Sequence, residues 1–385
     1  MFSSRVPRDL ASNRLFVATS AHRAAGRPLL DLTVSNPTTV GLHYPGDLLA
    51  PLASAAALAY RPEPFGMPAA RRAIVDDYRR RGISVAEDRV VLTASTSEAY
   101  SILFKLLCEA SGDTVLVPAP SYPLFDHLTR LDGVEWRPYA LEYHGRWEVD
   151  DSGVDRAWQD RTRAVLAVSP NNPTGSVLTG AELQTLGDRC AQGDAALIID
   201  EVFADYLFTD DACTAGGSKA LTFRLGGLSK SAGLPQVKLG WIAVEGPDEL
   251  VRAALQRLEL ICDTYLSVST PVQVAAPSLI ERGAVIRDQI RTRIRSNMNC
   301  LRAAVATEPS VELLNADGGW TAVLRVPARA SEEDLVIGLL ESRDTLAHPG
   351  YFFDFPHEAF LILSLLPDAA VFSEGIARLL EHVRG

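Results

Sequence analysis

The order of apolar and polar positions predicts strands that alternate with helices over the first two thirds of the chain. Short apolar runs of strand length stand between segments in which apolar residues recur with helical spacing. The runs that we interpret as strands cover residues 30–34, 89–92, 114–117, 164–168, 195–199, 219–225 and 239–244. The segments that we interpret as helices cover residues 48–59, 68–81, 97–110, 122–130 and 180–191. Such alternation is typical of βαβ units, so we expect an α/β fold with a mostly parallel sheet flanked by helices.

The pattern changes after about residue 245, where helical periodicity continues over residues 247–262 and 276–307. The remainder predicts a small α+β unit, with strands near 320–326 and 360–365 and a last helix over 371–383. The N-terminal arm has no core of its own and is expected to pack on this unit. We therefore expect a large domain over residues 46–275, and a small domain built from residues 1–45 and 276–385.

Composition and charge narrow the possible functions. The chain has 385 residues and a net charge of -11, which argues against a nucleic-acid partner because phosphate binding requires a basic surface. Its arginine clusters lie in helical segments and are interpreted as solvated or interfacial faces. No apolar run is long enough to span a membrane, and residues 1–15 lack the apolar core of a signal peptide. The five cysteines are scattered, which favours a reduced cytoplasm over a disulfide scaffold or a metal site.

Polar or glycine-containing loops follow the predicted strands. They cover residues 93–97, 120–123, 169–175, 200–201 and 228–241. In a parallel sheet, a ligand binds beyond the carboxyl ends of the strands, so these loops predict one common site. Lys230 lies in the last of them and has two interpretations. It either forms an imine with a carbonyl cofactor or is a solvated lysine, as most lysines are. Its occurrence with the other loops favours the first.

Three motifs carry a resemblance that covers nearly the whole chain. They are Asn172-Pro173-Thr174-Gly175, then Asp200-Glu201-Val202-Phe203, and Ser229-Lys230 followed by Gly233-Leu234-Pro235 and Gly240-Trp241. In this order and spacing they resemble the fold-type I pyridoxal-phosphate enzymes of the class I/II aminotransferase family. The resemblance implies a seven-stranded type of sheet in the large domain and pyridoxal 5'-phosphate (PLP) as cofactor. It also implies amino acid and 2-oxo acid substrates, and a homodimer with shared active sites.

The resemblance assigns the central chemistry to Lys230, Asp200 and Asn172. Lys230 would bind the cofactor aldehyde as a Schiff base and later move the proton of the substrate α-carbon. Asp200 would pair with the protonated pyridine nitrogen, while Glu201 is interpreted as structural. Asn172 would donate to the phenolic oxygen of the cofactor. Phe203 stands where the family usually has a tyrosine that shares this task, and Tyr206 is a candidate substitute.

The resemblance also implies a phosphate site and two aromatic contacts. Ser95, Thr96 and Ser97 open a predicted helix, and helix N-termini bind anions. An ordinary helix cap at Thr96 or Ser97 explains the same residues. Ser229 and Lys238 are expected to join this site, although Lys238 stands where the family most often has arginine and lacks its bidentate fork. Tyr122 would stack on the cofactor ring, and Tyr60 would reach the phosphate of the neighbouring subunit.

The chain departs from the family at the site for the substrate carboxylate. The family usually places an arginine in the last strand, and Ile362 occupies that position here. We expect the N-terminal arm to supply a replacement through Arg14 or, less favoured, Arg5. The turn at Ser35 and Asn36 is a further candidate for substrate binding.

Two alternatives to an aminotransferase remain open from the sequence. One is a fold-type I enzyme of another reaction class, such as a lyase, racemase or oxidase, because the scaffold motifs do not select the bond that is broken. The other is a non-catalytic PLP-binding protein, which the replacements at Phe203 and Ile362 would allow.

Overall fold

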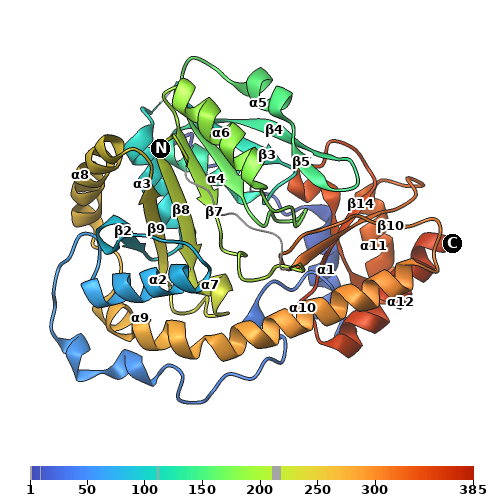
Figure 1. The fold of residues 1–385 in the computed structure, drawn as a ribbon. Helices are drawn as coiled ribbons and strands as arrows, with labels where there is room; N and C mark the ends of the chain where they lie inside the picture. The colour runs from blue at the N-terminus through green and yellow to red at the C-terminus, as the bar shows by residue number, and fades with distance from the viewer. Residues whose placement is uncertain (1, 9, 111, 210–217) are drawn as a thin grey trace.

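The computed structural model describes residues 2–8, 10–110, 112–209 and 218–385. The largest sheet has eight strands in the described part of the chain (Figure 1). In spatial order they are β2 (Val90–Thr93), β9 (Gly240–Glu245), β8 (Thr222–Gly227), β7 (Ala196–Asp200), β6 (Thr162–Val168), β3 (Thr114–Ala119), β4 (Glu135–Tyr143) and β5 (Trp147–Val149). The core run from β8 to β4 is parallel, whereas β9 is antiparallel to both of its neighbours and β5 is antiparallel to β4. The expected mostly parallel sheet is confirmed.

Both faces of this sheet are buried by helices, which explains why its strands read as continuous apolar runs. In β7, Ala196 and Ile198 pack into a core with α3, α4 and α8, whereas Leu197 and Ile199 pack on the other face with α5 and α6. The bounds of these helices are α3 (Thr96–Leu107), α4 (Leu124–Asp132), α5 (Asp151–Ala157), α6 (Gly180–Gln192) and α8 (Asp248–Tyr265).

A second, smaller sheet is formed by the C-terminal part of the chain. Its strands are β10 (Glu312–Leu313), β11 (Thr321–Arg325), β14 (Phe360–Ser364) and β13 (His348–Pro349), in that spatial order and antiparallel throughout. Helices α11 (Glu332–Arg343) and α12 (Ala369–Arg384) accompany it. The N-terminal arm joins this part, because β1 (Leu30–Asp31) pairs with β12 (Thr345–Leu346) and α1 (Arg14–Ala24) packs on α11. Residues 14–31 of the arm therefore pack on the C-terminal part, whereas Arg5 contacts Leu131 on α4.

Helices α2 (Pro68–Arg80), α9 (Thr270–Arg282) and α10 (Ala284–Val305) connect the two parts through one hydrophobic core. The long α10 runs beneath both (Figure 1). The predicted domain boundary between residues 275 and 276 falls inside α9, so the division into domains stays a prediction.

The structure differs from the predicted elements in several places, including the unpredicted helices α5 and α11. Residues 48–59 do not form one helix but two short 3-10 turns, η2 (Ala50–Ala53) and η3 (Ala55–Leu58), with Pro51 at the start of the first and Ser54 capping the second. Neither turn has a buried residue, so no packing sustains a longer helix. Strands β4 and β5 were not expected; β4 lacks a continuous apolar run and contains Pro138.

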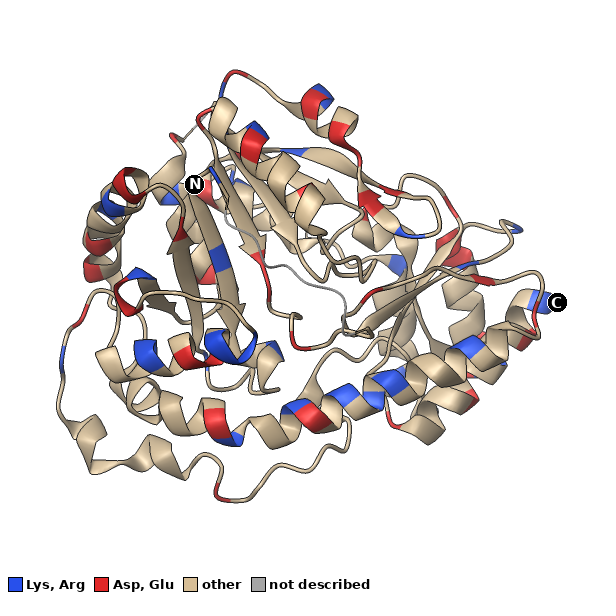
Figure 2. Cartoon of the chain, in the orientation of Figure 1, with Lys and Arg blue, Asp and Glu red and all other residues tan. Residues whose placement is uncertain are grey.

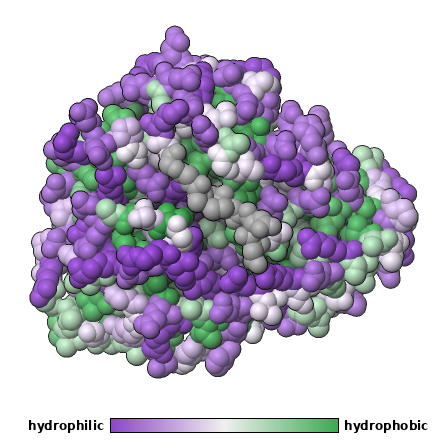
Figure 3. All heavy atoms as spheres, in the orientation of Figure 1, coloured by the Kyte–Doolittle hydropathy of each residue, from purple (hydrophilic) through white to green (hydrophobic). Residues whose placement is uncertain are grey.

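Charged side chains are spread over the described chain, and those along α10 are mostly arginines (Figure 2). Arg287 lies 3.8 Å from both Asp77 and Asp205, and Arg293 lies 3.6 Å from Asp368. These two arginines therefore lie at interfaces between elements. Most of the surface in Figure 3 is hydrophilic, with smaller hydrophobic areas between. Among the described residues, no helix has both the length and the apolar character needed to cross a membrane.

Candidate active site

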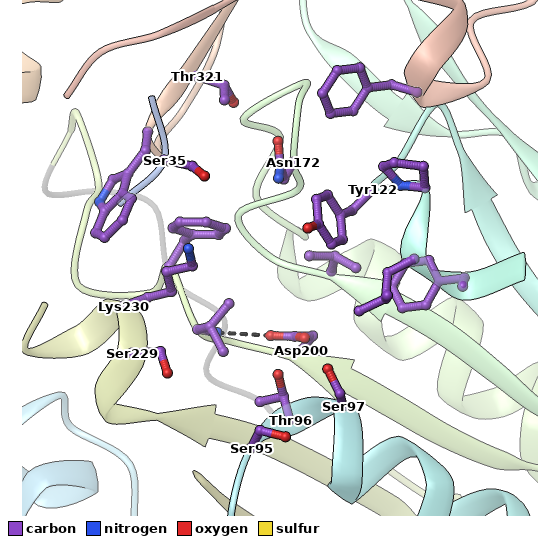
Figure 4. A pocket seen from close by; sticks show the side chains of 18 of the residues that line it. Ser35, Ser95, Thr96, Ser97, Tyr122, Asn172, Asp200, Ser229, Lys230 and Thr321 are labelled. Carbon is purple, nitrogen blue, oxygen red and sulfur yellow. Dashed lines mark hydrogen bonds between the residues drawn. The ribbon is translucent and has the colours of Figure 1, made fainter. Parts of the chain in front are cut away.

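A cavity of about 770 Å³ lies between the carboxyl ends of the large sheet's strands and the small sheet. It collects most of the residues that the sequence singled out. Those that line it are Ser35, Ser95, Thr96, Ser97, Tyr122, Asn172, Asp200, Ser229, Lys230 and Lys238. Figure 4 shows Asp200, Ser95, Thr96, Ser97 and Ser229 on one side of Lys230, with Ser35 and Thr321 on the other.

Lys230 is held by the short helix α7 (Leu228–Ser231), which starts directly after β8. Its amine forms no hydrogen bond or ion pair with any described residue, and it lies 5.0 Å from the ring centre of Trp320 and 5.7 Å from that of Phe203. Burial lowers the pKa of Lys230, and the Asp200 carboxylate opposes that shift. The amine of this partly buried residue is therefore reactive in its neutral form and free to bond to a ligand.

Asp200 ends β7, so its side chain leaves the sheet at the cavity. Its carboxylate accepts a hydrogen bond from Tyr100 Oη at 2.8 Å and another from the Val202 amide at 3.0 Å. Burial raises the pKa of Asp200 to about 6, and these two donors oppose the rise. Tyr100 itself stays protonated, because burial raises its pKa well above the usual value. Tyr100 was not predicted from the sequence as a site residue. The only sequence feature that indicates it is its position one helical turn after Thr96, on the helix that opens the site.

Glu201 turns away from the cavity. Its carboxylate pairs with the buried Arg224 and lies 3.6 Å from Arg81. Glu201 does not line the cavity and instead belongs to a charged network with Arg224 and Arg81. This agrees with the structural role expected for it.

The N-terminus of α3 faces the same cavity. Ser95 is the cap, since its hydroxyl accepts from the Glu98 amide at 3.1 Å. The cap is therefore not Thr96 or Ser97, whose hydroxyls form no hydrogen bond within the described part of the chain and remain available to a ligand. Lys238 also lines the cavity and has a left-handed backbone, with φ of 59°. Together these groups provide the donors and positive charge that an anion requires.

Asn172 and Tyr122 lie on the remaining side of the cavity (Figure 4). The Asn172 Oδ1 atom is buried and has no hydrogen-bond partner among the described residues, so this amide is unengaged by the protein. Tyr206 does not compensate for Phe203. It is fully buried, and its hydroxyl donates to the backbone carbonyl of Lys230 at 2.6 Å.

The end of the cavity near the small sheet has no arginine among its described lining residues. Ile362 is there, as expected, together with Thr321, His348 and Ser364. Arg14 does not line the cavity, because its guanidinium is paired with Glu333 at 2.8 Å and Asp334 at 2.9 Å on α11.

Three further candidates also lie outside the cavity. Arg5 donates to the Leu131 carbonyl at 3.1 Å. Asn36 caps a turn by accepting from the Thr38 amide at 3.0 Å, and it borders an adjoining hollow that also reaches Lys230. Tyr60 is 72% exposed and lies on a separate, much smaller depression. Within one chain, none of the three lines the large cavity itself, although the hollow beside Asn36 reaches Lys230.

Comparisons with known proteins agree with this geometry. A sequence profile of the family "Aminotransferase class I and II" matches residues 50–379. The chain is 27% identical over 370 residues to alanine aminotransferase of Mycobacterium tuberculosis strain H37Rv, covering 92% of this chain and 86% of that protein. It is 25% identical over 369 residues to glutamate-pyruvate aminotransferase AlaA of Haemophilus influenzae, covering 92% and 90%. The solved structure of alanine aminotransferase from Pyrococcus furiosus has a TM-score of 0.89 at 20% identity, covering 100% of both chains.

The family profile spans most of the chain, and the fold is that of solved aminotransferases. The protein therefore belongs to the class I and II aminotransferases, which are PLP-dependent transaminases.

Proposed function

We propose that Lys230 is the residue that binds the PLP aldehyde and then moves the proton while an amino group passes between an amino acid and a 2-oxo acid. The observation that carries this proposal is the amine of Lys230, which projects from a partly buried residue, has no hydrogen-bond or ion-pair partner among the described residues and faces the cavity beside Asp200. A structural lysine in a partly buried position is expected to be paired, because removing an unpaired charge from water is costly.

The residues around Lys230 fit PLP. Bound PLP supplies an electron-withdrawing ring that stabilises the charge left on a substrate carbon when a proton is removed. Asp200 would pair with its pyridine nitrogen, and the Asn172 amide nitrogen Nδ2 would donate to its phenolic oxygen. Thr96, Ser97 and the α3 N-terminus would hold the phosphate, with Ser229 and Lys238 beside them.

The lowered pKa of Lys230 also suits proton transfer. A neutral amine can accept a proton from the substrate α-carbon, whereas an ammonium cannot. The rings of Trp320 and Phe203 border this amine and limit access of water to it. The hydrogen bond from Tyr206 to the Lys230 carbonyl fixes the backbone from which the amine projects.

The relatives suggest which substrates to try first. The M. tuberculosis protein is named for alanine, and the H. influenzae protein for glutamate and pyruvate. We therefore propose alanine and glutamate as amino donors for this chain, with pyruvate and 2-oxoglutarate as acceptors.

The proposed working form is a cytoplasmic homodimer with shared active sites. In support, Tyr60 is 72% exposed and Leu58 is 89% exposed, in a segment that has no buried residue in either of its turns. A second subunit that covers this segment would remove an unfavourable apolar surface from water and place Tyr60 near another cavity.

The test of Lys230 is covalent trapping. The protein is loaded with PLP and reduced with borohydride, and the modified peptide is located by mass spectrometry. Lys230→Ala should prevent labelling, whereas Lys219→Ala, which removes an exposed lysine paired with Asp188, should leave it unchanged. Full-yield labelling of the Lys230→Ala protein would show that another residue binds the cofactor.

A further inference from the structure

The cavity end near the small sheet lacks the positive charge that a substrate carboxylate would be expected to meet. Ile362 projects there from β14, and Arg14 is already held by two carboxylates outside the cavity. An α-amino acid nevertheless brings its carboxylate next to the carbon that reacts at Lys230. A polar residue on this wall would be placed to act as the donor instead.

Strand register places one polar ring directly beside Ile362. In the antiparallel pair β13–β14, His348 is opposite Ile362, and side chains of opposed residues lie on the same face of a sheet. In the pair β11–β14, Thr321 is opposite Ser364, two residues further along. His348, Ile362, Thr321 and Ser364 therefore share the face that lines the cavity.

The two hydroxyl groups on this face are already used as donors. Thr321 Oγ1 donates to the Pro173 carbonyl at 2.9 Å, and Ser364 Oγ donates to the Val34 carbonyl at 2.5 Å. His348 is different. Neither of its ring nitrogens is hydrogen-bonded within the described residues, and Nδ1 is buried without a partner. Nε2 is not buried in this way, so it is the ring nitrogen that meets the cavity.

The surroundings of the His348 imidazole determine whether Nδ1 or Nε2 carries the ring proton. The rings of Phe352 and Phe353 lie 5.8 and 5.9 Å from it and pack edge-on or tilted. Burial lowers the pKa of His348, with the Asp31 carboxylate opposing the shift, so the ring is neutral at neutral pH. An unpaired buried N–H is rarer and more costly than an unpaired acceptor. The favoured tautomer therefore leaves Nδ1 as the bare acceptor and directs an Nε2–H donor into the cavity.

We propose that His348 binds the α-carboxylate of the substrate through this Nε2–H, in place of an arginine at position 362. The inference rests on the proposed transamination of an α-amino acid. One neutral donor holds a carboxylate less tightly than the paired charged donors of an arginine. The wall should therefore discriminate only modestly between an amino acid and the matching amine.

Three variants distinguish a hydrogen-bond donor at His348 Nε2 from a role of the size of this side chain. The amide nitrogen of glutamine can occupy about the position of Nε2, whereas that of asparagine reaches only about the position of Nδ1. His348→Gln should therefore keep kcat/KM for alanine within about threefold, whereas His348→Asn and His348→Ala should lower it about 10- to 100-fold, mainly through KM. Ethylamine, which lacks the carboxylate, should react at nearly the same rate in all four proteins.

Calorimetric binding of propionate to the PLP-loaded proteins provides a readout that does not depend on turnover. Its Kd should rise about 10-fold or more in His348→Asn and His348→Ala, and little in His348→Gln. Equal binding of propionate by all four proteins would overturn the proposal, as would an equal loss of activity toward alanine and ethylamine. If wild-type protein transaminates no amino acid but binds propionate in a His348-dependent way, the proposed function fails while the carboxylate site stands.

Discussion

Asp200 is a single residue whose environment makes a measurable prediction. Its pKa of about 6 in the folded protein exceeds the value of about 3.9 in an unfolded chain. The folded protein therefore binds more protons than the unfolded chain between these two values, and the contribution of Asp200 to stability becomes less favourable as pH rises through this window. Above about pH 6 the ionised Asp200 carboxylate lowers the free energy of unfolding by its full amount, on the order of 2–3 kcal/mol.

We expect cofactor-free Asp200→Asn to be more stable than cofactor-free wild type at pH 7, and the difference to vanish near pH 4. The Tyr100 hydroxyl can reverse and accept from the new amide, so its hydrogen bond is kept. Urea unfolding across this pH range measures the difference. Tyr100→Phe is the matched control, because it removes a donor to the carboxylate and should move the midpoint of the wild-type curve to higher pH. A stability difference that is constant with pH would contradict the raised pKa.

Glu332 links two elements that build the wall of the cavity. It begins α11, is 1% exposed and accepts from the Tyr351 amide at 2.8 Å and the Phe360 amide at 2.6 Å. These amides belong to η5 (Gly350–Phe353) and to the start of β14. The carboxylate therefore fixes the segment that carries Phe352 and Phe353 into the cavity.

Glu332→Ala should lower the free energy of unfolding by about 2–4 kcal/mol, since it leaves two backbone donors without an acceptor. It should also raise KM for the amino donor, because the wall around His348 loosens. Urea unfolding and steady-state kinetics measure the two effects. Glu341→Ala on the exposed side of the same helix is the control and should change stability by less than about 0.5 kcal/mol. Equal effects of the two substitutions would remove Glu332 from this role.

Strands with both faces buried were predictable from the sequence, whereas strand β4 and the two short turns near residue 54 were not. Strands such as β6 and β7 are continuous apolar runs because helices cover both faces of the sheet. Strand β4 lies near the edge and alternates irregularly between exposed and buried positions, so no run marks it. Residues 48–59 are rich in alanine, but helix propensity without a buried face did not give a helix.

At the scale of the whole molecule, the motif residues could be predicted to meet because parallel strands bring their carboxyl ends to one edge. Lys230 and Asp200 line one cavity for this reason. His348 and Tyr100 could not be found in this way, since their roles depend on cross-strand register and on a helix that passes behind Asp200. Arg14 was expected from its charge and its place in the N-terminal arm, but its guanidinium pairs with the acidic residues at the start of α11 instead.

The proposed homodimer predicts complementation between two defective proteins. Lys230→Ala lacks the reactive amine, and Tyr60→Ala lacks a side chain that we place in the site of the other subunit. In a mixed dimer, one site then carries both defects and the other carries neither. Random reassortment makes about half of the dimers mixed, so about a quarter of all sites become intact.

Mixing the two proteins under conditions that exchange subunits should therefore restore up to about a quarter of wild-type activity, well above either protein alone. Sedimentation of the wild-type protein checks that a dimer is present, and the mixture is compared with Lys230→Ala mixed with Asp200→Ala. In that control both defects lie in the same cavity of one chain. One site of a mixed dimer then lacks Lys230 and the other lacks Asp200, so little activity should return. If the Tyr60 mixture recovers no more than this control, Tyr60 does not act across the subunit boundary.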